Sequence, residues 1–488
     1  MATSTEIIQK YNDKSATSSK LASGLYIFSK SVMETPNKPD LNESSLLMPP
    51  INEYKRTCVK YISEVLEVKT NLENISYGDN VIFKLPIYND YYHDICAVVE
   101  IDPIGTQGLN ARTSPSYFCC DYPGLRIFNE TTFKWNQIEH EKYTPYSALF
   151  HRRFNVPEDS RRSFDLSIGQ EVEQTAYLYY PDLQIRERKK ILNGHQTRKT
   201  YHPSLIMTIP LIFSFCNNIG NVFSIRQDED SYDGTIEFKL ENADKIWFKY
   251  DPLTNTTTAL NNENAPKLRS IKLLLNTLKL PLSNSSEILR APSIRMITRT
   301  LNIRVNYQMT IGVNRYRLID VRNLLTHIFF GFRNPSDNSY DNWHLFGNIQ
   351  RVNQVEPFAL SDLDNPNDPY ILGQNNVVYN KQSKIIDNIK FTLNSTDLTV
   401  KKVCEYYSNY LSTKQTTAQS SEDDFLYSYY IGESTGINCE RSILDLTSNN
   451  DLYLEWESSI EQNIEIIFCA NIIKPTLNNL KLIKPDSS

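Results

Sequence analysis

The sequence predicts an all-β fold of two tandem β-sandwich domains with short helices in the loops. Three observations support this prediction. Apolar and polar side chains alternate in many segments, which is typical of strands with one buried face. The 30 Tyr and 21 Phe, together with many Ile, Thr and Val residues, favour strands. The chain has 488 residues, which exceeds the size of a typical single domain.

The clearest alternation runs from Ile297 to Gly312. Seven of its eight odd-numbered positions are apolar, and none of its even-numbered positions is. A helix would spread both classes around its whole surface, whereas a strand separates them onto two faces. The segment therefore predicts one long half-buried strand, or two strands that meet at a bend.

Shorter stripes with the same period lie on both sides of mid-chain. They are Val81-Phe83-Leu85-Ile87, Ile236-Phe238-Leu240, Ile389-Phe391-Leu393 and Leu452-Leu454-Trp456. Denser apolar runs predict strands that are buried on both faces. These runs are Met207–Phe215, Ile328–Phe332 and Ile464–Ile473. Helical patterns are short and cover Val59–Leu66, Ser147–Phe154 and Val400–Leu411.

Long polar segments suggest the domain organisation. Residues 1–50 are rich in Ser, Thr, Asn and Pro and predict an N-terminal arm, which is either a loose terminus or a strap over a neighbouring subunit. Residues 254–266 are polar, aperiodic and close to mid-chain, so they predict a linker. The first β domain would then comprise residues 51–253 and the second residues 267–488.

Charge and cysteine usage restrict the partners and the compartment. The net charge is -6 at pH 7 and the pI is about 5.8, which argues against nucleic acid as a direct partner because binding to phosphates requires a positive face. The eight cysteines are scattered without zinc-type spacing, so we expect reduced and mostly buried thiols. We expect neither a secretion signal nor a membrane span, because no apolar run reaches ~18 residues.

No catalytic, cofactor-binding or metal-ligating residue is predicted. Gly432–Gly436 spells the G-x-S-x-G motif of serine hydrolases, but that motif needs a later histidine and the last one is His344. The carboxylates of Asp228–Asp230 and Asp233 suggest either a cation site or a solvated hairpin tip. The seven histidines are dispersed, and the Trp343–His344 pair predicts a packed loop anchor.

One basic segment leaves two interpretations open. Only Glu187 opposes its cationic residues, which are Arg186, Arg188, Lys189, Lys190, Arg198 and Lys199. The segment predicts either a contact with an acidic neighbour or an anionic membrane surface, or a plain solvated loop that needs no partner.

Several of these segments resemble the major capsid proteins of nucleocytoplasmic large DNA viruses. Leu205–Asn217 resembles a first-barrel strand that ends in an aromatic step and Asn. Tyr122–Ile127 is similar to the family's Pro-Gly-Leu-Arg step, and Phe83–Asp90 to its first strand. In the second half, Ile328–Phe332 followed by Asp341–Gly347 resembles asfarvirus-type capsid proteins. The matches keep the family's order over roughly residues 75–475.

The resemblance implies two tandem eight-stranded jelly-roll domains and no enzymatic activity. It implies a homotrimer that contacts neighbouring capsomers, minor capsid proteins and an inner membrane, but not nucleic acid, in the icosahedral virion of a large double-stranded DNA virus. Assembly would take place in the host cytoplasm. No cofactor is expected. Two alternatives stay open: a membrane-coating scaffold of the same fold, and a tandem jelly-roll carbohydrate-binding protein or glycosidase, which would need convergent aromatics or a catalytic carboxylate pair.

Overall fold

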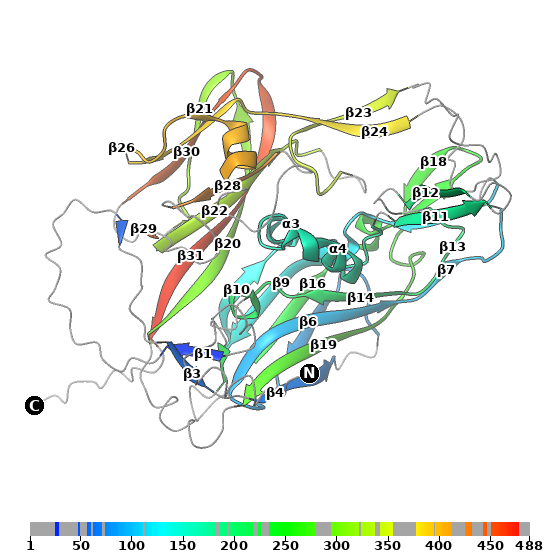
Figure 1. Cartoon of the computed structure of the whole chain (residues 1–488), viewed down its shortest axis with the longest axis horizontal. Helices are drawn as coiled ribbons and strands as arrows, with labels where there is room; N and C mark the ends of the chain where they lie inside the picture. The colour runs from blue at the N-terminus through cyan, green and yellow to red at the C-terminus, as the bar shows by residue number, and fades with distance from the viewer. Residues whose placement is uncertain are drawn as a thin grey trace, which may run out of the picture.

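The structure is a computed structural model of the 488-residue chain, and most of its ordered elements are β-strands (Figure 1). It describes residues 25–28, 47–48, 56–59, 62–70, 74–110, 113–172, 174–180, 185–192, 196, 198–217, 223–225, 234–279, 294–321, 324–336, 342–354, 377–394, 396–411, 425–431, 443–446 and 450–477. These residues form two β-sandwich units that lie side by side, with helices α3 (Pro145–Phe154) and α4 (Glu158–Ser167) between them in the view of Figure 1.

The first unit consists of two facing antiparallel sheets. One has the strand order β10-β9-β16-β5 and the other β14-β6-β19-β4, with β15 paired to β6 at one end. In chain order the strands are β4 (Ile62–Lys69), β5 (Asn80–Lys84), β6 (Tyr91–Ile101), β9 (Phe128–Trp135), β10 (Ile138–Tyr143), β14 (Leu205–Pro210), β15 (Phe223–Ser224), β16 (Gly234–Leu240) and β19 (Leu268–Lys279).

The second unit repeats this arrangement. Its sheets have the orders β29-β22-β31-β20 and β21-β30-β25-β26, with β28 paired to β22 and β27 paired to β25. In chain order the strands are β20 (Ile294–Met309), β21 (Gly312–Arg317), β22 (Leu324–Arg333), β25 (Asn388–Leu393), β26 (Thr396–Asp397), β27 (Lys402–Val403), β28 (Leu426–Tyr430), β29 (Ile443–Asp445), β30 (Leu452–Ser458) and β31 (Gln462–Leu477).

Both units have jelly-roll connectivity. When the eight principal strands of each unit are counted in chain order, one sheet reads 6-3-8-1 and the other contains 5-4-7-2. Successive strands therefore alternate between the sheets except for strands 4 and 5, which pair within one sheet, and the first and last strands also pair, as in two interlocked Greek keys. The prediction of two eight-stranded jelly rolls with loop helices is confirmed.

The alternating stripes fill the interior of each sandwich. Val81 and Phe83 on β5 face Ile236 and Phe238 on β16, and all four side chains are buried. In the second unit the stripes of β25 and β30 are buried in the same way, and β22 and β31 are buried on both faces over most of their length. The predicted long strand at residue 297 is β20, and Gly312 opens the next strand.

The boundary between the domains was predicted too early in the sequence. Residues 254–266 are not a linker, because β18 (Thr256–Ala259) pairs with β17 (Trp247–Asp251) of the first unit. The Asn262 side-chain amide donates to the backbone oxygen of Tyr77 at 2.9 Å, so this polar segment packs on the first unit. Strand β19 then closes that unit by pairing with β6 and β4. The boundary therefore follows Lys279.

Two local predictions were also wrong. Val59–Leu66 is not helical, because the edge of β19 pairs with β4 along the whole length of β4. The apolar run Met207–Phe215 is a strand only as far as Pro210, which has no N–H to donate. The next residues turn into the short helix α5 (Ser214–Asn217), and the buried Glu141 carboxylate accepts the backbone N–H of Ser214 at 2.8 Å.

The other helices are short and lie in the loops between strands. The prediction of a helix at Ser147–Phe154 is confirmed by α3, whereas α4 was missed. Residues 404–411 are helical, with a π-helix at Tyr406–Tyr410, so the prediction for Val400–Leu411 holds for its second part. The Pro-Gly-Leu-Arg step is the short helix α2 (Pro123–Arg126), and a 3-10 helix covers Ala243–Lys245.

Of the remaining strands, β1 and β3 precede the first jelly roll, and the others are inserted between jelly-roll strands. The hairpins β11–β12 and β23–β24 extend towards the right in Figure 1, and the β1–β3 pair lies at the bottom of the view. These strands are β1 (Leu25–Phe28), β3 (Arg56–Val59), β7 (Ile104–Gly105), β8 (Ser116–Cys119), β11 (Gln174–Tyr180), β12 (Ile185–Leu192), β13 (Tyr201–His202), β23 (Asn348–Gln354) and β24 (Val377–Ser383).

Only residues 25–28 and 47–48 of the predicted arm are described. Leu47–Met48 forms strand β2, which pairs with β29 at the edge of the second unit of the same chain. This segment therefore connects to the far jelly roll of its own chain. Whether other parts of residues 1–50 reach a neighbouring subunit stays a prediction.

Candidate functional site: the seam between the two jelly rolls

The seam between the units is built around helix α3, which directly follows β10. Pro145 occupies the first turn, where its missing N–H has no helical partner to lose. The backbone N–H of Thr144 donates to the Ser147 hydroxyl at 3.4 Å, which fixes the start of the helix. The helix places Tyr146, Phe150 and Phe154 one turn apart, so all three rings face the second unit.

An aromatic cluster fills the middle of the seam. Phe154 of α3 stacks on Phe329 of β22 with ring centroids 4.5 Å apart and planes 13° apart. Phe150 lies 5.7 Å from Phe346, which follows β22 in the chain. The cluster also includes Ile467 and other side chains of the second unit, and it is distinct from the two sandwich cores. Because each buried Phe contributes several kcal/mol, ~3–5 on truncation to Ala, this seam is a third small core.

Trp343 extends the second unit into the core of the first. Its side chain is 2% exposed and packs with the buried residues of the first sandwich. Its indole Nε1 donates to the carbonyl oxygen of Asp121 at 2.7 Å. The guanidinium of Arg126 lies over the indole ring at 5.1 Å. The predicted loop anchor is therefore a contact between the two units.

The buried side chain of Arg333 holds this anchor in place. Arg333 is fully buried and donates from Nη1 to both the Tyr146 hydroxyl and the Trp343 carbonyl oxygen, at 2.7 Å each. Its Nε lies 3.7 Å from the buried carboxylate of Glu465. Removing one member of such a pair leaves an uncompensated buried charge, which is costly. The hydrogen bond from Arg333 to Tyr146 crosses the seam, so this buried charge favours one fixed arrangement of the two units.

The seam continues along the edge of β20. The Asn302 side-chain amide donates to the backbone oxygen of Lys142 at 2.9 Å, and its side-chain oxygen accepts from Ser147. A cavity of about 190 Å³ lies here, lined by residues of both units that include Tyr146, Arg304 and Lys245. Its lining mixes polar and apolar side chains, and the polar ones can hold ordered water.

The buried thiols at the seam and in the core are poor nucleophiles. Burial raises the pKa of Cys469 to about 12, and it raises the pKa of Cys120 to about 12 as well. Cys119 ends β8, and Cys120 lies just past the strand, so both can be buried in one core although they are adjacent. Six of the described cysteines are free, namely Cys96, Cys119, Cys120, Cys216, Cys404 and Cys469. The expectation of reduced, mostly buried thiols agrees with these six.

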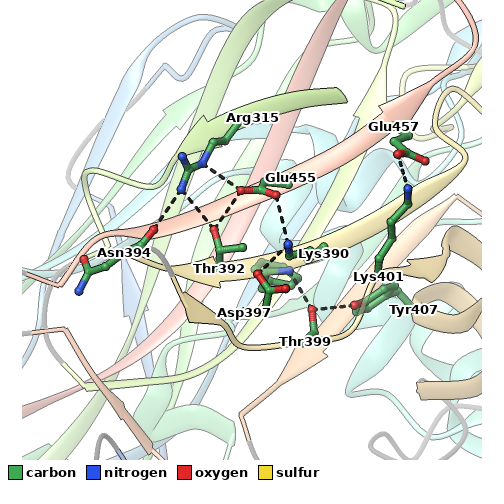
Figure 2. Close-up of polar contacts among 11 residues, drawn as sticks. Arg315, Lys390, Thr392, Asn394, Asp397, Thr399, Lys401, Tyr407, Glu455 and Glu457 are labelled. Atoms are coloured by element: carbon green, nitrogen blue, oxygen red, sulfur yellow. Dashed lines mark hydrogen bonds and ion pairs between the residues drawn. The ribbon is translucent and has the colours of Figure 1, made fainter. Parts of the chain in front are cut away.

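Figure 2 shows a charged network on the outer face of the sheet β21-β30-β25-β26. Glu455 accepts from Arg315 at 3.1 Å and lies 3.7 Å from Lys390. Asp397 accepts from Lys390 at 2.6 Å, and Lys401 pairs with Glu457. The network links neighbouring strands across the sheet. Exposed ion pairs add little stability individually, so its main effect is a hydrophilic surface.

This face bears on the glycosidase alternative, because Glu455 and Glu457 point to the same side of β30. A glycosidase general acid needs a raised pKa. The hydrogen bonds from Lys401 and Asn388 hold the pKa of Glu457 below its usual value. Glu455 lies between two cations. Glu457 therefore lacks the raised pKa of an acid catalyst.

Other candidate residues lie apart from the seam or outside the described part. Arg198 stacks over the Tyr250 ring at 4.0 Å, and Lys199 pairs with Glu171, so both have partners within the chain. The side chains of the basic residues 186–190 are outside the description, although their strand pairs with β11. Residues 228–233 and 432–436 are not described either.

Metal and membrane features were searched within the described ranges. Among these residues, no group of three or more His, Cys, Asp or Glu side chains is placed to hold a metal ion. No helix in this part of the chain combines the length and apolarity needed to span a membrane.

Comparison with known proteins identifies the fold. A Faustovirus major capsid protein superposes with a TM-score of 0.70 at 16% identity, over 91% of this chain and 94% of that chain. The chain has the double jelly-roll fold of a viral capsid protein. In the PBCV-1 virus capsid, a quasi-atomic model matches with a TM-score of 0.58 at 12% identity, over 87% of this chain and 98% of that one. No family model and no curated protein sequence matches.

A third structure shares this double jelly roll. PBCV-1 VP54, whose crystal structure was fitted into a reconstruction of the virophage Sputnik, matches with a TM-score of 0.56 at 13% identity, over 87% of this chain and 98% of that chain. All three matches cover both jelly rolls, since each spans most of both chains. The shared element is therefore the pair of sandwiches.

Proposed function

We propose that this chain is the major capsid protein of a large double-stranded DNA virus, and that three copies form a capsomer with a near-hexagonal outline. The arrangement of two jelly rolls locked side by side by a buried seam carries this proposal. It provides one rigid block per chain, because each sandwich has its own core and the seam adds a third. Such blocks suit a wall that must resist deformation.

The role is structural rather than catalytic. The Glu455 and Glu457 carboxylates are paired with cations and the Cys469 thiol is buried. The long insertions lie outside the sandwiches, where they can vary without disturbing the cores. Three chains would place six jelly rolls in a ring, and such rings tile an icosahedral shell in the virion. Neighbouring capsomers, minor capsid proteins and an inner membrane would be the partners, with assembly in the host cytoplasm.

The mass of the purified chain in solution tests this proposal. Sedimentation or light scattering should give a particle of three times 56.5 kDa that persists on dilution to low micromolar concentration. An obligate interface of this kind buries more than ~2,000 Å² and dissociates slowly. A stable monomer under all conditions would overturn the proposal. Binding of a monomer to a sugar array, or hydrolysis of glycosides, would favour the carbohydrate alternative instead.

A further inference from the structure

The two jelly rolls repeat one connection, and its pair of aromatic rings is buried in the first unit and partly exposed in the second. In the first unit, α3 begins directly after the fifth strand, β10. In the second unit, the helical residues 404–411 begin directly after β27, one of the two short strands that pair with β25 at the position of the fifth strand. The two helices are therefore equivalent in topology.

The equivalence extends to their aromatic side chains. Phe150 and Phe154 are four residues apart and stack with ring centroids at 6.3 Å and planes 12° apart. Tyr406 and Tyr410 are also four residues apart and stack at 5.3 Å and 24°. The Phe pair is buried in the seam, whereas Tyr410 is 53% exposed. The same pair of stacked rings is thus buried in one unit and partly exposed in the other.

The surface that receives α3 also has a counterpart. Phe150 and Phe154 rest on the outer face of the sheet β29-β22-β31-β20, on Phe329, Ile467 and Cys469. The equivalent sheet of the first unit is β14-β6-β19-β4. Because it occupies the same place in the sandwich, its outer face is where an equivalent helix would dock.

That outer face carries an apolar strip that crosses the sheet. Cys96 on β6 lies beside Leu274 on β19, and Val98 lies one pair further along β6. These three side chains are half-buried, whereas their neighbours in the strands are buried in the core. Towards the two edges, Val65 on β4 is 65% exposed and Ile206 on β14 is 63% exposed. The strip is therefore partly open to water in the isolated chain.

Charged residues border both surfaces. Beside the strip, Lys272 lies 3.6 Å from Glu100 and 4.0 Å from Glu67. Beside the Tyr pair, Glu405 lies 3.8 Å from Lys384, and Lys402 lies over the Tyr406 ring at 5.8 Å. Each rim carries both signs of charge around an apolar centre. That pattern gives docking a defined register without repulsion between like charges.

We propose that Tyr406 and Tyr410 of one chain pack on the apolar strip around Cys96 and Leu274 of a second copy of this chain. The contact repeats between chains what α3 does within one chain. It rests on the proposed function and names the surfaces that join its subunits. A head-to-tail contact of this kind joins the second unit of one copy to the first unit of the next, and it ends only when the ring closes.

Charge insertion tests the two surfaces separately. The variants are Tyr410→Asp and Ile206→Asp, one on each side of the contact. The controls are Val313→Asp and Ile82→Asp, which change residues that are 67% and 52% exposed on the other sheet of each unit. Sedimentation should show the controls assembled like the wild type, and the two test variants dissociated with at least a tenfold higher dissociation constant. Circular dichroism checks that each variant is folded.

A thiol cross-link tests the contact directly, because Cys96 is a native thiol on the strip. Tyr410→Cys should form covalent dimers and trimers with a bismaleimide reagent, and the double variant Tyr410→Cys, Cys96→Ser should not. If the wild type is a trimer, both charge variants assemble equally well and the cross-links do not depend on Cys96, this inference is overturned and the proposed function stands. A wild-type monomer overturns the proposed function itself.

Discussion

The indole Nε1 of Trp343 donates a hydrogen bond to the carbonyl oxygen of Asp121 at 2.7 Å, although 222 positions separate the two residues in the chain. Asp121 belongs to the first jelly roll and Trp343 to a loop of the second. The bond therefore connects two units that fold around separate cores. It makes the pair of sandwiches behave as one block, and this property can be measured.

Truncation of Trp343 should destabilise the whole chain. Trp343→Ala is expected to lower the free energy of unfolding by about 3–5 kcal/mol, because it leaves a cavity and an unsatisfied carbonyl group. Urea denaturation at one fixed protein concentration measures the loss. Leu345→Ala, which changes a half-buried neighbour, should cost clearly less. Equal midpoints for Trp343→Ala and the wild type would show that the anchor does not stabilise the fold.

Removal of the aromatic rings of α3 should uncouple the units. The double variant Phe150→Ala, Phe154→Ala deletes most of the contact between α3 and Phe329 while leaving both sandwich cores intact. Calorimetry is expected to show one transition for the wild type and two for the variant. Phe164→Ala on α4 is the matched control, because its ring packs on the first unit. A single transition in the double variant would contradict this account.

Gly331 should not tolerate a side chain. It lies on β22, and a Cβ atom there would overlap the ring of Phe346, which is itself buried in the seam. Gly331→Ala is expected to cost about 1–3 kcal/mol of stability, as overpacking does. Shortening the obstructing ring in Gly331→Ala, Phe346→Leu should recover part of the loss. If the double variant is less stable than the sum of both changes, the overlap is not the cause.

His151 should make the fold sensitive to acid. Burial lowers its pKa from about 6.5 to about 4, so the unfolded chain binds a proton between these values and the folded chain does not. The stabilisation is complete above pH 6.5 and is lost as the pH falls towards 4. Stability measured across this range should fall less steeply in His151→Gln. Parallel curves for the variant and the wild type would refute the assignment.

Much of the fold could be predicted because side chains alternate along a strand. Stripes such as Ile389-Phe391-Leu393 have an apolar face whatever the rest of the chain does, so the strands were found where the period was clear. The prediction of secondary structure failed where pairing with a distant strand determined the conformation. Residues around Val65 have a mixed pattern, and the free edge of β19 made them a strand.

The seam could be anticipated only in part. The Trp343–His344 pair indicated an anchor, but the sequence did not say that it enters the other unit. Phe150 and Phe329 are buried apolar residues like many others in the chain, and no local pattern marks them as partners. The π-helix Tyr406–Tyr410 shows its relation to α3 only after the strands have been matched.

The sequence by itself determined that the chain forms strands and which face of each strand is apolar, because that information lies in residues two positions apart. Tertiary structure decided where the first unit ends, because β19 had to reach back to β6 and β4 to close the sandwich. It also decided which surfaces meet at the seam. Contacts between residues hundreds of positions apart depend on the closure of both sheets, and a local sequence pattern does not predict that closure.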